Sequence, residues 1–142
     1  MRISDVLRRK GDQVVTVPPD ESVRTLLAML FEHRVGAMVV SADGRTVDGI
    51  VSERDVVRHL HSDGEQMLSE TVAQIMTSEV HTCAPDATVV ELMRTMTDQR
   101  VRHIPVVVAG ELAGIVSIGD VVKHRIDELT DERDHLTAYI SR

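Results

Sequence analysis

The chain has 142 residues, 42% of them apolar and 27% charged, which is enough to bury the core of one compact domain without disulfides. Its 16 basic and 23 acidic residues give a formal net charge of −7, which argues against non-specific binding to nucleic acid or to an anionic membrane. One phenylalanine and one tyrosine leave no aromatic platform on which successive bases could stack.

The single cysteine and the first residues predict the setting in which the protein works. One cysteine cannot form an internal disulfide, a cysteine-rich metal cage or a CxxC redox pair. The N-terminus has no apolar stretch of signal-peptide length, and no segment approaches the length of a membrane span. We therefore expect a soluble, cytoplasmic protein.

From the N-terminus, the first half predicts the order strand, helix, strand, strand, helix. A Pro-Asp turn follows the first strand, and Ser22 offers an N-cap oxygen to a helix whose apolar residues recur at helical spacing. The next two strands meet at Asp43-Gly44, a pair that suits a hairpin, and a second helix begins at Glu53. The predicted strands are residues 14–17, 37–41 and 47–52.

The second half predicts the same order. Thr88 replaces Ser22 as the N-cap, Ala109-Gly110 forms the hairpin turn, and the last helix begins at Ile118. The predicted strands are residues 80–83, 104–108 and 112–117.

The two halves correspond residue by residue, which identifies an internal duplication. Residues 16–44 align without gaps on residues 82–110, a shift of 66, and residues 49–52 align on residues 114–117, a shift of 65. The segments that lead into the copies, residues 3–7 and 72–76, correspond more roughly. One copy alone would have a single sheet face to bury, so we expect the copies to pack sheet to sheet about a pseudo-two-fold axis, with equivalent clefts on either side. The predicted parts are residues 1–62 (first repeat), 63–71 (linker), 72–125 (second repeat) and 126–142 (helical extension).

The segments GIVSERD (residues 49–55) and GIVSIGD (residues 114–120) carry the chemistry. In each, an apolar strand ends at a serine in the N-cap position, and an aspartate lies in the first turn of the following helix. The hydroxyl and the free N–H groups of a helix N-terminus can hold a phosphate oxygen, and a carboxylate can accept both hydroxyls of a ribose cis-diol. This combination suits a ribonucleotide. The alternative is a capping box, in which serine and acid satisfy only the N–H groups of their own helix.

These two G-h-h-S-x-x-D motifs (h, apolar), the segment HIPVV at residues 103–107 and the Met76-Thr77 turn make the chain resemble a CBS-domain pair, or Bateman module. The resemblance runs from Ile3 to about Arg125 and is to the stand-alone bacterial type, in which the pair is nearly the whole protein. It implies an α/β (α+β) fold of two tandem β-α-β-β-α repeats. It also implies adenosine ligands in the clefts between the repeats: AMP, ADP or ATP, and sometimes NAD(H) or S-adenosylmethionine.

Carried over by position, the resemblance implies that Asp55 and Asp120 hold the ribose, with Ser52 and Ser117 beside the sugar and phosphate. It also implies that the backbone of the first strands and of the segment before the Pro-Val pair contacts the adenine edge. The candidates for this contact are Thr16, Val17, Ala37, Met38, Thr82, Cys83, His103, Ile104 and Pro105. Val39 stands where the second copy has Pro105, so we expect two unequal sites, of which one can be filled and the other empty.

Four side chains are candidates for contact with the ligand's phosphates, because the alignment places them near the clefts: Lys10, Arg54, Arg102 and His103. Each of them is equally consistent with an ordinary surface charge.

Three weaker signals have structural interpretations. The histidines predict no metal site, because His59-x-His61 has no carboxylate at a useful spacing and no HExxH occurs. Cys83 lies on a predicted strand and is expected in the core. Residues 126–140 predict an amphipathic helix that packs on its own domain or supplies a homodimer contact, and we favour the dimer.

Two classes of function remain. The first is a nucleotide sensor whose occupancy is detected by an unknown target protein. The second is a ligand-free interaction module that works through its dimer surface; the resemblance, through plant relatives, adds the regulation of redox enzymes such as thioredoxins. We expect no enzyme, because the sequence offers no nucleophile–base pair, metal constellation or paired carboxylates in one site.

Overall fold

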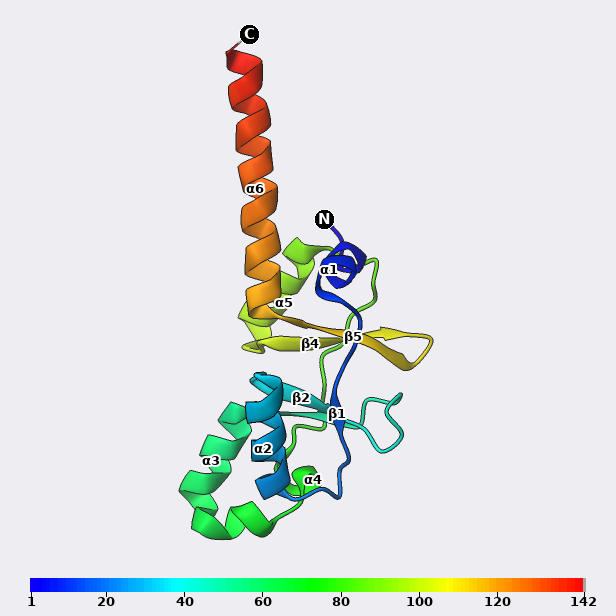
Figure 1. Ribbon diagram of the computed structural model, residues 1–142, viewed down its shortest axis with the longest axis vertical. Helices are drawn as coiled ribbons and strands as arrows, with labels where there is room; N and C mark the ends of the chain where they lie inside the picture. Colours follow the sequence, from blue (N-terminus) through cyan, green and yellow to red (C-terminus); the bar gives the residue numbers. More distant parts are fainter. Residues whose placement is uncertain (142) are drawn as a thin grey trace.

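Two small sheets are stacked across the middle of the molecule, with helices on their outer sides (Figure 1). The structure is a computed structural model that describes residues 1–141. The elements in chain order are α1 (Ile3–Lys10), β1 (Thr16–Val17), α2 (Val23–His33), β2 (Ala37–Val40), β3 (Gly49–Ser52), α3 (Glu53–Asp63), the 3₁₀ helix η1 (Gly64–Ser69), α4 (Val72–Ile75), α5 (Val89–Gln99), β4 (His103–Val108), β5 (Glu111–Ser117) and α6 (Ile118–Ile140). Helices α2, α3 and α4 lie on the side of β1, β2 and β3, whereas α1, α5 and α6 lie on the side of β4 and β5. The predicted α+β class and the tandem arrangement are confirmed.

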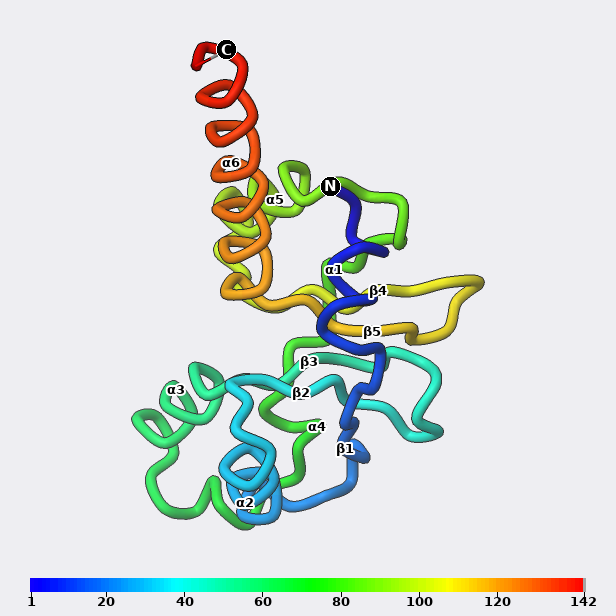
Figure 2. Tube along the Cα trace, turned by 45° about the horizontal axis from the view of Figure 1, so that its top comes forward, coloured from blue at the N-terminus to red at the C-terminus, as the bar shows by residue number. Residues whose placement is uncertain are grey.

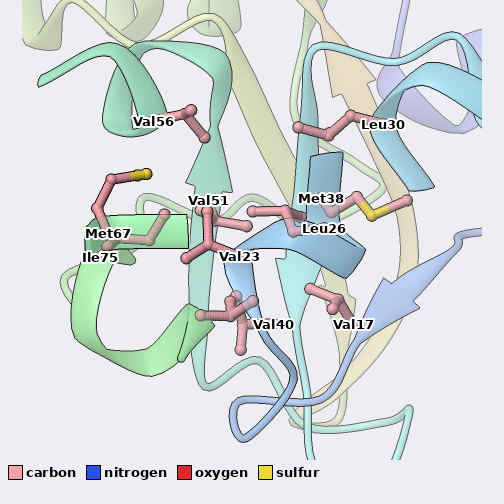
Figure 3. Packing of buried hydrophobic residues seen from close by; sticks show 11 residues of the cluster. Val17, Val23, Leu26, Leu30, Met38, Val40, Val51, Val56, Met67 and Ile75 are labelled. Carbon is pink, nitrogen blue, oxygen red and sulfur yellow. The ribbon is translucent and has the colours of Figure 1, made fainter. Parts of the chain in front are cut away.

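The first half folds much as its sequence predicts, although the strand predicted over residues 14–17 forms only at Thr16–Val17. The Ser22 side chain accepts a hydrogen bond of 3.1 Å from the Thr25 N–H, which fixes the start of α2. β1 pairs with β2 in parallel, and β2 pairs with β3 antiparallel, with Ala37 opposite Ser52. The apolar residues below this sheet form one buried cluster (Figure 3): Val17, Val23, Leu26, Leu30, Met38, Val40, Val51, Val56, Met67, Val72 and Ile75.

The prediction of a strand over residues 80–83 was wrong about its length. Only Cys83 pairs there, as an isolated parallel bridge to β4. The Cys83 N–H donates to the Pro105 carbonyl at 3.1 Å, and the Val107 N–H donates to the Cys83 carbonyl at 2.9 Å. The next step of a parallel ladder would need an N–H at position 105, which proline lacks, so the pairing stops. The first copy has Val39 at that position, and there β1 pairs over two residues.

The hairpin of the second half and the last helix follow their predictions more closely. Ala109 and Gly110 have φ of 52° and 80°, the left-handed values that a tight two-residue hairpin turn requires. α6 runs without a break from the end of β5 and projects far beyond the body (Figure 1). Val121 and His124 are buried against the body, whereas residues 129–141 are exposed. Within residues 1–141, no helix has both the length and the apolar character that crossing a membrane demands.

The segment that leads into each repeat packs in the core of the other repeat. α1, a helix that the sequence did not predict, buries Ile3 and Val6 completely in the cluster beneath β4 and β5. α4 buries Val72 and Ile75 in the cluster of the first half. Figure 2 shows α1 lying beside β5 and α4 lying near β2 and β3. The two repeats have therefore exchanged their leading segments.

Backbone hydrogen bonds fix both exchanged segments. The Ile3 N–H donates to the Ala87 carbonyl, and the Val72 N–H donates to the Glu21 carbonyl, each at 2.8 Å. The boundaries drawn from the duplication, residues 1–62 and 72–125, thus describe the sequence and not the packing units. Residues 1–10 belong in space to the second half.

The glycine that opens each motif makes room for an exchanged segment. A Cβ atom on Gly49 would lie 2.5 Å from Met76 Sδ and 2.9 Å from the Thr77 carbonyl oxygen. A Cβ atom on Gly114 would lie 2.7 Å from Leu7 Cδ2. Leu7 and Met76 occupy corresponding places in the two leading segments. Packing alone therefore accounts for the first residue of both motifs.

Replacing these glycines by alanine should destabilise the protein unequally. Gly49→Ala should lower the free energy of unfolding by about 1–3 kcal/mol, as overpacking usually does. The Thr77 carbonyl cannot retreat, because it accepts a 2.9 Å hydrogen bond from the Ile50 N–H. Gly114→Ala should cost less, since the end of the Leu7 side chain can rotate away. Urea unfolding followed by circular dichroism measures both, and a Gly114 variant at least as damaged as the Gly49 variant would contradict this prediction.

Candidate functional site

Both motifs form capping boxes, at the starts of α3 and α6. The Ser52 N–H donates to Asp55 Oδ2 at 2.8 Å, and the Asp55 N–H donates to Ser52 Oγ at 3.4 Å. In the second copy, the Ser117 N–H donates to Asp120 Oδ2 at 2.9 Å, and the Asp120 N–H donates to Ser117 Oγ at 3.2 Å. The structural role that competed with ligand binding is therefore present in both copies, and any contact with a ligand comes in addition to it.

The carboxylate of Asp55 is almost enclosed. The residue is 9% exposed, and its Oδ2 also accepts a 3.1 Å hydrogen bond from the Ser52 hydroxyl. Its Oδ1 accepts a 3.5 Å hydrogen bond from Thr77 Oγ1, on the segment that follows α4. Both carboxylate oxygens are thus engaged within the protein, one of them by the exchanged segment.

The carboxylate of Asp120 is more open and is paired with a cation. Its side chain is 23% exposed, and Lys10 Nζ, at the end of α1, donates to Asp120 Oδ2 at 2.7 Å and to the Ile115 carbonyl at 2.8 Å. Burial raises the pKa of the Asp120 carboxyl, but Lys10 and the Ser117 N–H outweigh it, so that this pKa is below its ordinary value. Among residues 1–141, no group donates a hydrogen bond to Asp120 Oδ1. One acceptor atom of an ionised carboxylate is therefore free.

His103 belongs to the same cluster of charges. It is half-buried at the start of β4, and burial lowers the pKa of its imidazole. Lys10 and, more weakly, Arg102 also lower this pKa, whereas the carboxylates of Asp120 and Glu53 raise it, and the net result is a pKa below the ordinary value. The ring is consequently neutral at pH 7. The structure thus brings together four of the predicted residues from three separate parts of the chain: Lys10, Arg102, His103 and Asp120.

Ser117 caps Asp120 in this cluster, and Ser52 and Asp55 form the corresponding box in the first half, but the other predicted residues place no side chain in the cluster. Thr16 is half-buried on β1, and Arg54 and Thr82 are exposed. Five side chains are buried within the two halves and offer a ligand at most their backbone: Val17, Ala37, Met38, Ile104 and Pro105.

Cys83 packs against the second core, as predicted from its strand position. Burial raises the pKa of its thiol to about 11, so the reactive thiolate is scarce at neutral pH. Its backbone N–H and carbonyl are both bonded to β4. The Cys83 N–H is therefore not available to an adenine ring, whereas its carbonyl oxygen keeps a second lone pair that can accept a hydrogen bond.

Two surface hollows lie next to the predicted clefts. One is at the end of α2 and reaches Gly36 and Glu53, and the other lies along α1 and reaches Ala113 on β5. None of the predicted site residues lines either hollow.

Sequence reasoning missed two members of the site, Thr77 and Glu53. Thr77 was part of the motif that carried the family resemblance, but it was not linked to Asp55. The available signal was the pairing of residues 3–7 with residues 72–76, since the chain just after each segment reaches a motif aspartate. Glu53 directly follows the N-cap Ser52, so only the stacking of the sheets shows that its charge acts on His103.

Comparison with known proteins identifies the repeats. The CBS domain family matches residues 3–62 and 72–127. A CBS-domain-containing protein of Agrobacterium tumefaciens, known from its crystal structure, is 46% identical, with a TM-score of 0.85 over 88% of this chain and 99% of that chain. The mitochondrial CBS domain-containing protein CBSX3 of Arabidopsis thaliana is 38% identical over 97% of this chain and 71% of its own length. The CBS domain pair of protein MJ0100, solved with 5′-methylthioadenosine and S-adenosyl-L-methionine, is 21% identical and shares the fold, with a TM-score of 0.79 over 90% of this chain and 98% of that chain.

Proposed function

The chain belongs to the CBS-domain family, as a tandem pair of that domain, and on this premise we propose that it is a regulatory module that binds an adenosine-containing ligand beside Asp120. The observation that carries the proposal is the free Oδ1 of an ionised, partly exposed carboxylate at a helix N-terminus. A carboxylate in this state accepts the two hydroxyls of a ribose. The MJ0100 pair, whose ligands both contain adenosine, supports the choice of ligand class.

The ion pair between Lys10 and Asp120 supplies the switch. When the ribose takes the carboxylate, Lys10 Nζ loses its 2.7 Å partner and becomes available to a phosphate, together with the N-terminus of α6. Lys10 ends α1, whose other side lies in the core of the second half. Ligand binding therefore acts on the exchanged segment, and it shifts the balance of conformations by the difference in its affinity for them.

The site around Asp55 keeps a structural role in this proposal. Its carboxylate is nearly buried, both oxygens are bonded, and its neighbour from the exchanged segment is a threonine instead of a lysine. The two sites, which were expected to differ because of Val39 and Pro105, thus also differ in the charge beside the aspartate. We assign ligand binding to the second copy alone.

Conservative variants of the two aspartates should show which copy binds the ligand. With AMP, ADP, ATP, NAD(H) and S-adenosylmethionine tested in a thermal-shift panel, at least one ligand should raise the melting temperature of the parent. Saturation at 100 times the Kd corresponds to about 2.7 kcal/mol, which is several degrees for a domain of this size. Asp120→Asn should lose this shift, and the matched Asp55→Asn should keep it. Equal shifts in all three proteins would refute the assignment, and no shift in the parent would favour the ligand-free interaction module.

The same panel, with 5′-methylthioadenosine added, identifies the part of the ligand that Lys10 contacts. Lys10→Met keeps most of the side-chain length and removes the charge. It should weaken binding of phosphate-bearing ligands more than binding of 5′-methylthioadenosine, which has no phosphate. If both classes are weakened to the same extent, Lys10 does not bind phosphate.

A second part of the proposal is self-association through α6, as the amphipathic tail suggested. Apart from Val121, which is buried in the second core, α6 carries apolar residues that are exposed. They alternate at spacings of four and three, which is the heptad pattern of a coiled-coil seam interrupted by Arg133. The apolar members of this stripe are all exposed: Val122, Ile126, Leu129, Leu136 and Ile140. Such a stripe is complementary to a second copy of itself, so we infer a homodimer.

Charges placed in the stripe should break this dimer. Leu129→Glu combined with Leu136→Glu should convert a dimer into a monomer in sedimentation velocity. Ala138→Glu is the matched control, because Ala138 is exposed but lies outside the stripe. A parent that sediments as a monomer, or a double variant that stays dimeric, would remove α6 as the dimer contact.

A further inference from the structure

His59, Asp63 and Glu70 bring one imidazole and two carboxylates together at the C-terminal end of α3, beyond Asp55 and in the half of the molecule that does not contain Asp120. One ligand atom of each residue lies within 4.8 Å of the corresponding atoms of the other two. We propose that these three residues bind a divalent transition-metal ion of the zinc class, which clamps α3 to the segment between the repeats.

The three side chains come from the two sides of the turn that follows α3. His59 and Asp63 are one helical turn apart on α3, with His59 Nδ1 at 3.7 Å from Asp63 Oδ2. The sequence predicted no metal here because His59-x-His61 lacked a nearby carboxylate, but Asp63 supplies one at the i+4 position. Gly64, with φ of 69°, ends α3, and η1 then turns the chain back.

The backbone of Glu70 is held firmly beside the end of α3. Its N–H donates to the Met67 carbonyl at 3.1 Å, and its carbonyl accepts a 2.9 Å hydrogen bond from the Val23 N–H. Met67 is fully buried in the first core. Bringing Glu70 to an ion on α3 therefore asks for side-chain rotation and no rearrangement of the chain.

The charges favour a cation at this place. Among residues 1–141, neither Asp63 nor Glu70 forms an ion pair with a lysine or arginine, and the nearest partner of Asp63 is His59. A nitrogen with two carboxylate oxygens is a donor set that suits zinc, whereas calcium and magnesium prefer oxygen alone. His59 and Asp63 have side chains that are 34% and 41% exposed, so an ion can enter from solvent and keep water as a further ligand.

Such an ion would act on the connection between the repeats. It would join α3 to residue 70, just before α4, which is the exchanged segment that completes the first core. The loop that it closes is η1, residues 64–69. Metal binding should consequently slow the opening of η1 without involving the Asp120 site.

Zinc titration of the metal-free full chain, followed by calorimetry, tests the proposal. We expect one zinc ion per chain. His59→Ala and Glu70→Gln should each weaken binding by about tenfold or more, since changes in the outer shell of a metal alone typically cost 10- to 100-fold. His61→Ala is the matched control and should bind zinc like the parent, because His61 is exposed on α3 but outside the cluster.

A second measurement reports on the clamp itself. In the parent, zinc should slow amide hydrogen exchange in residues 64–69, and in the His59→Ala variant it should not. Zinc binding that is absent from the parent, or that His61→Ala weakens as much as His59→Ala does, would overturn the proposal. Binding without slower exchange in residues 64–69 would overturn the clamp.

Discussion

The structure depends on the exchange of the leading segments between the two repeats. The core of each repeat is completed by the segment that leads into the other repeat. Ile3 and Val6 pack beneath β4 and β5, and Val72 and Ile75 pack beneath the first sheet. Burial of such side chains is the main favourable term in folding, so neither half can be removed without opening the other. The same exchange brings Lys10 to Asp120 and Thr77 to Asp55. The same exchange of segments therefore completes the two cores and places a side chain beside each motif aspartate.

Duplication supplied two equal frameworks, and a few substitutions made them unequal. Pro105, in place of Val39, stops the ladder of the second copy after one bridge, because proline has no N–H to donate. A lysine reaches one motif aspartate and a threonine reaches the other. The result is one carboxylate that is closed and one that is paired with a displaceable cation. In the proposed function, a single ligand acts on the pair through Lys10 without a second binding event.

Much of this fold could be predicted from the sequence, because its signals are local. The N-caps Ser22 and Thr88 and the hairpin turn at Gly110 satisfy backbone groups within a few residues of themselves. The exchange of segments could not be predicted, since the repeat pattern is the same whether Ile3 packs on its own copy or on the other. The shortened pairing at Cys83 was missed for a related reason: its cause is a proline on the neighbouring strand. The capping box at both motifs was foreseen as an alternative to a site, and the distances show it to be real.

The coupling of the two halves can be measured directly by native-state hydrogen exchange. Ile104 is 1% exposed in the second core, and Ile104→Ala should cost about 2–5 kcal/mol there. If the exchanged segments make the halves one cooperative unit, the slowest amides of β2 and β3 should lose the same free energy of opening as those of β4 and β5. Loss confined to β4 and β5, with β2 and β3 as protected as in the parent, would show that the halves open independently and that Lys10 cannot transmit a signal between them.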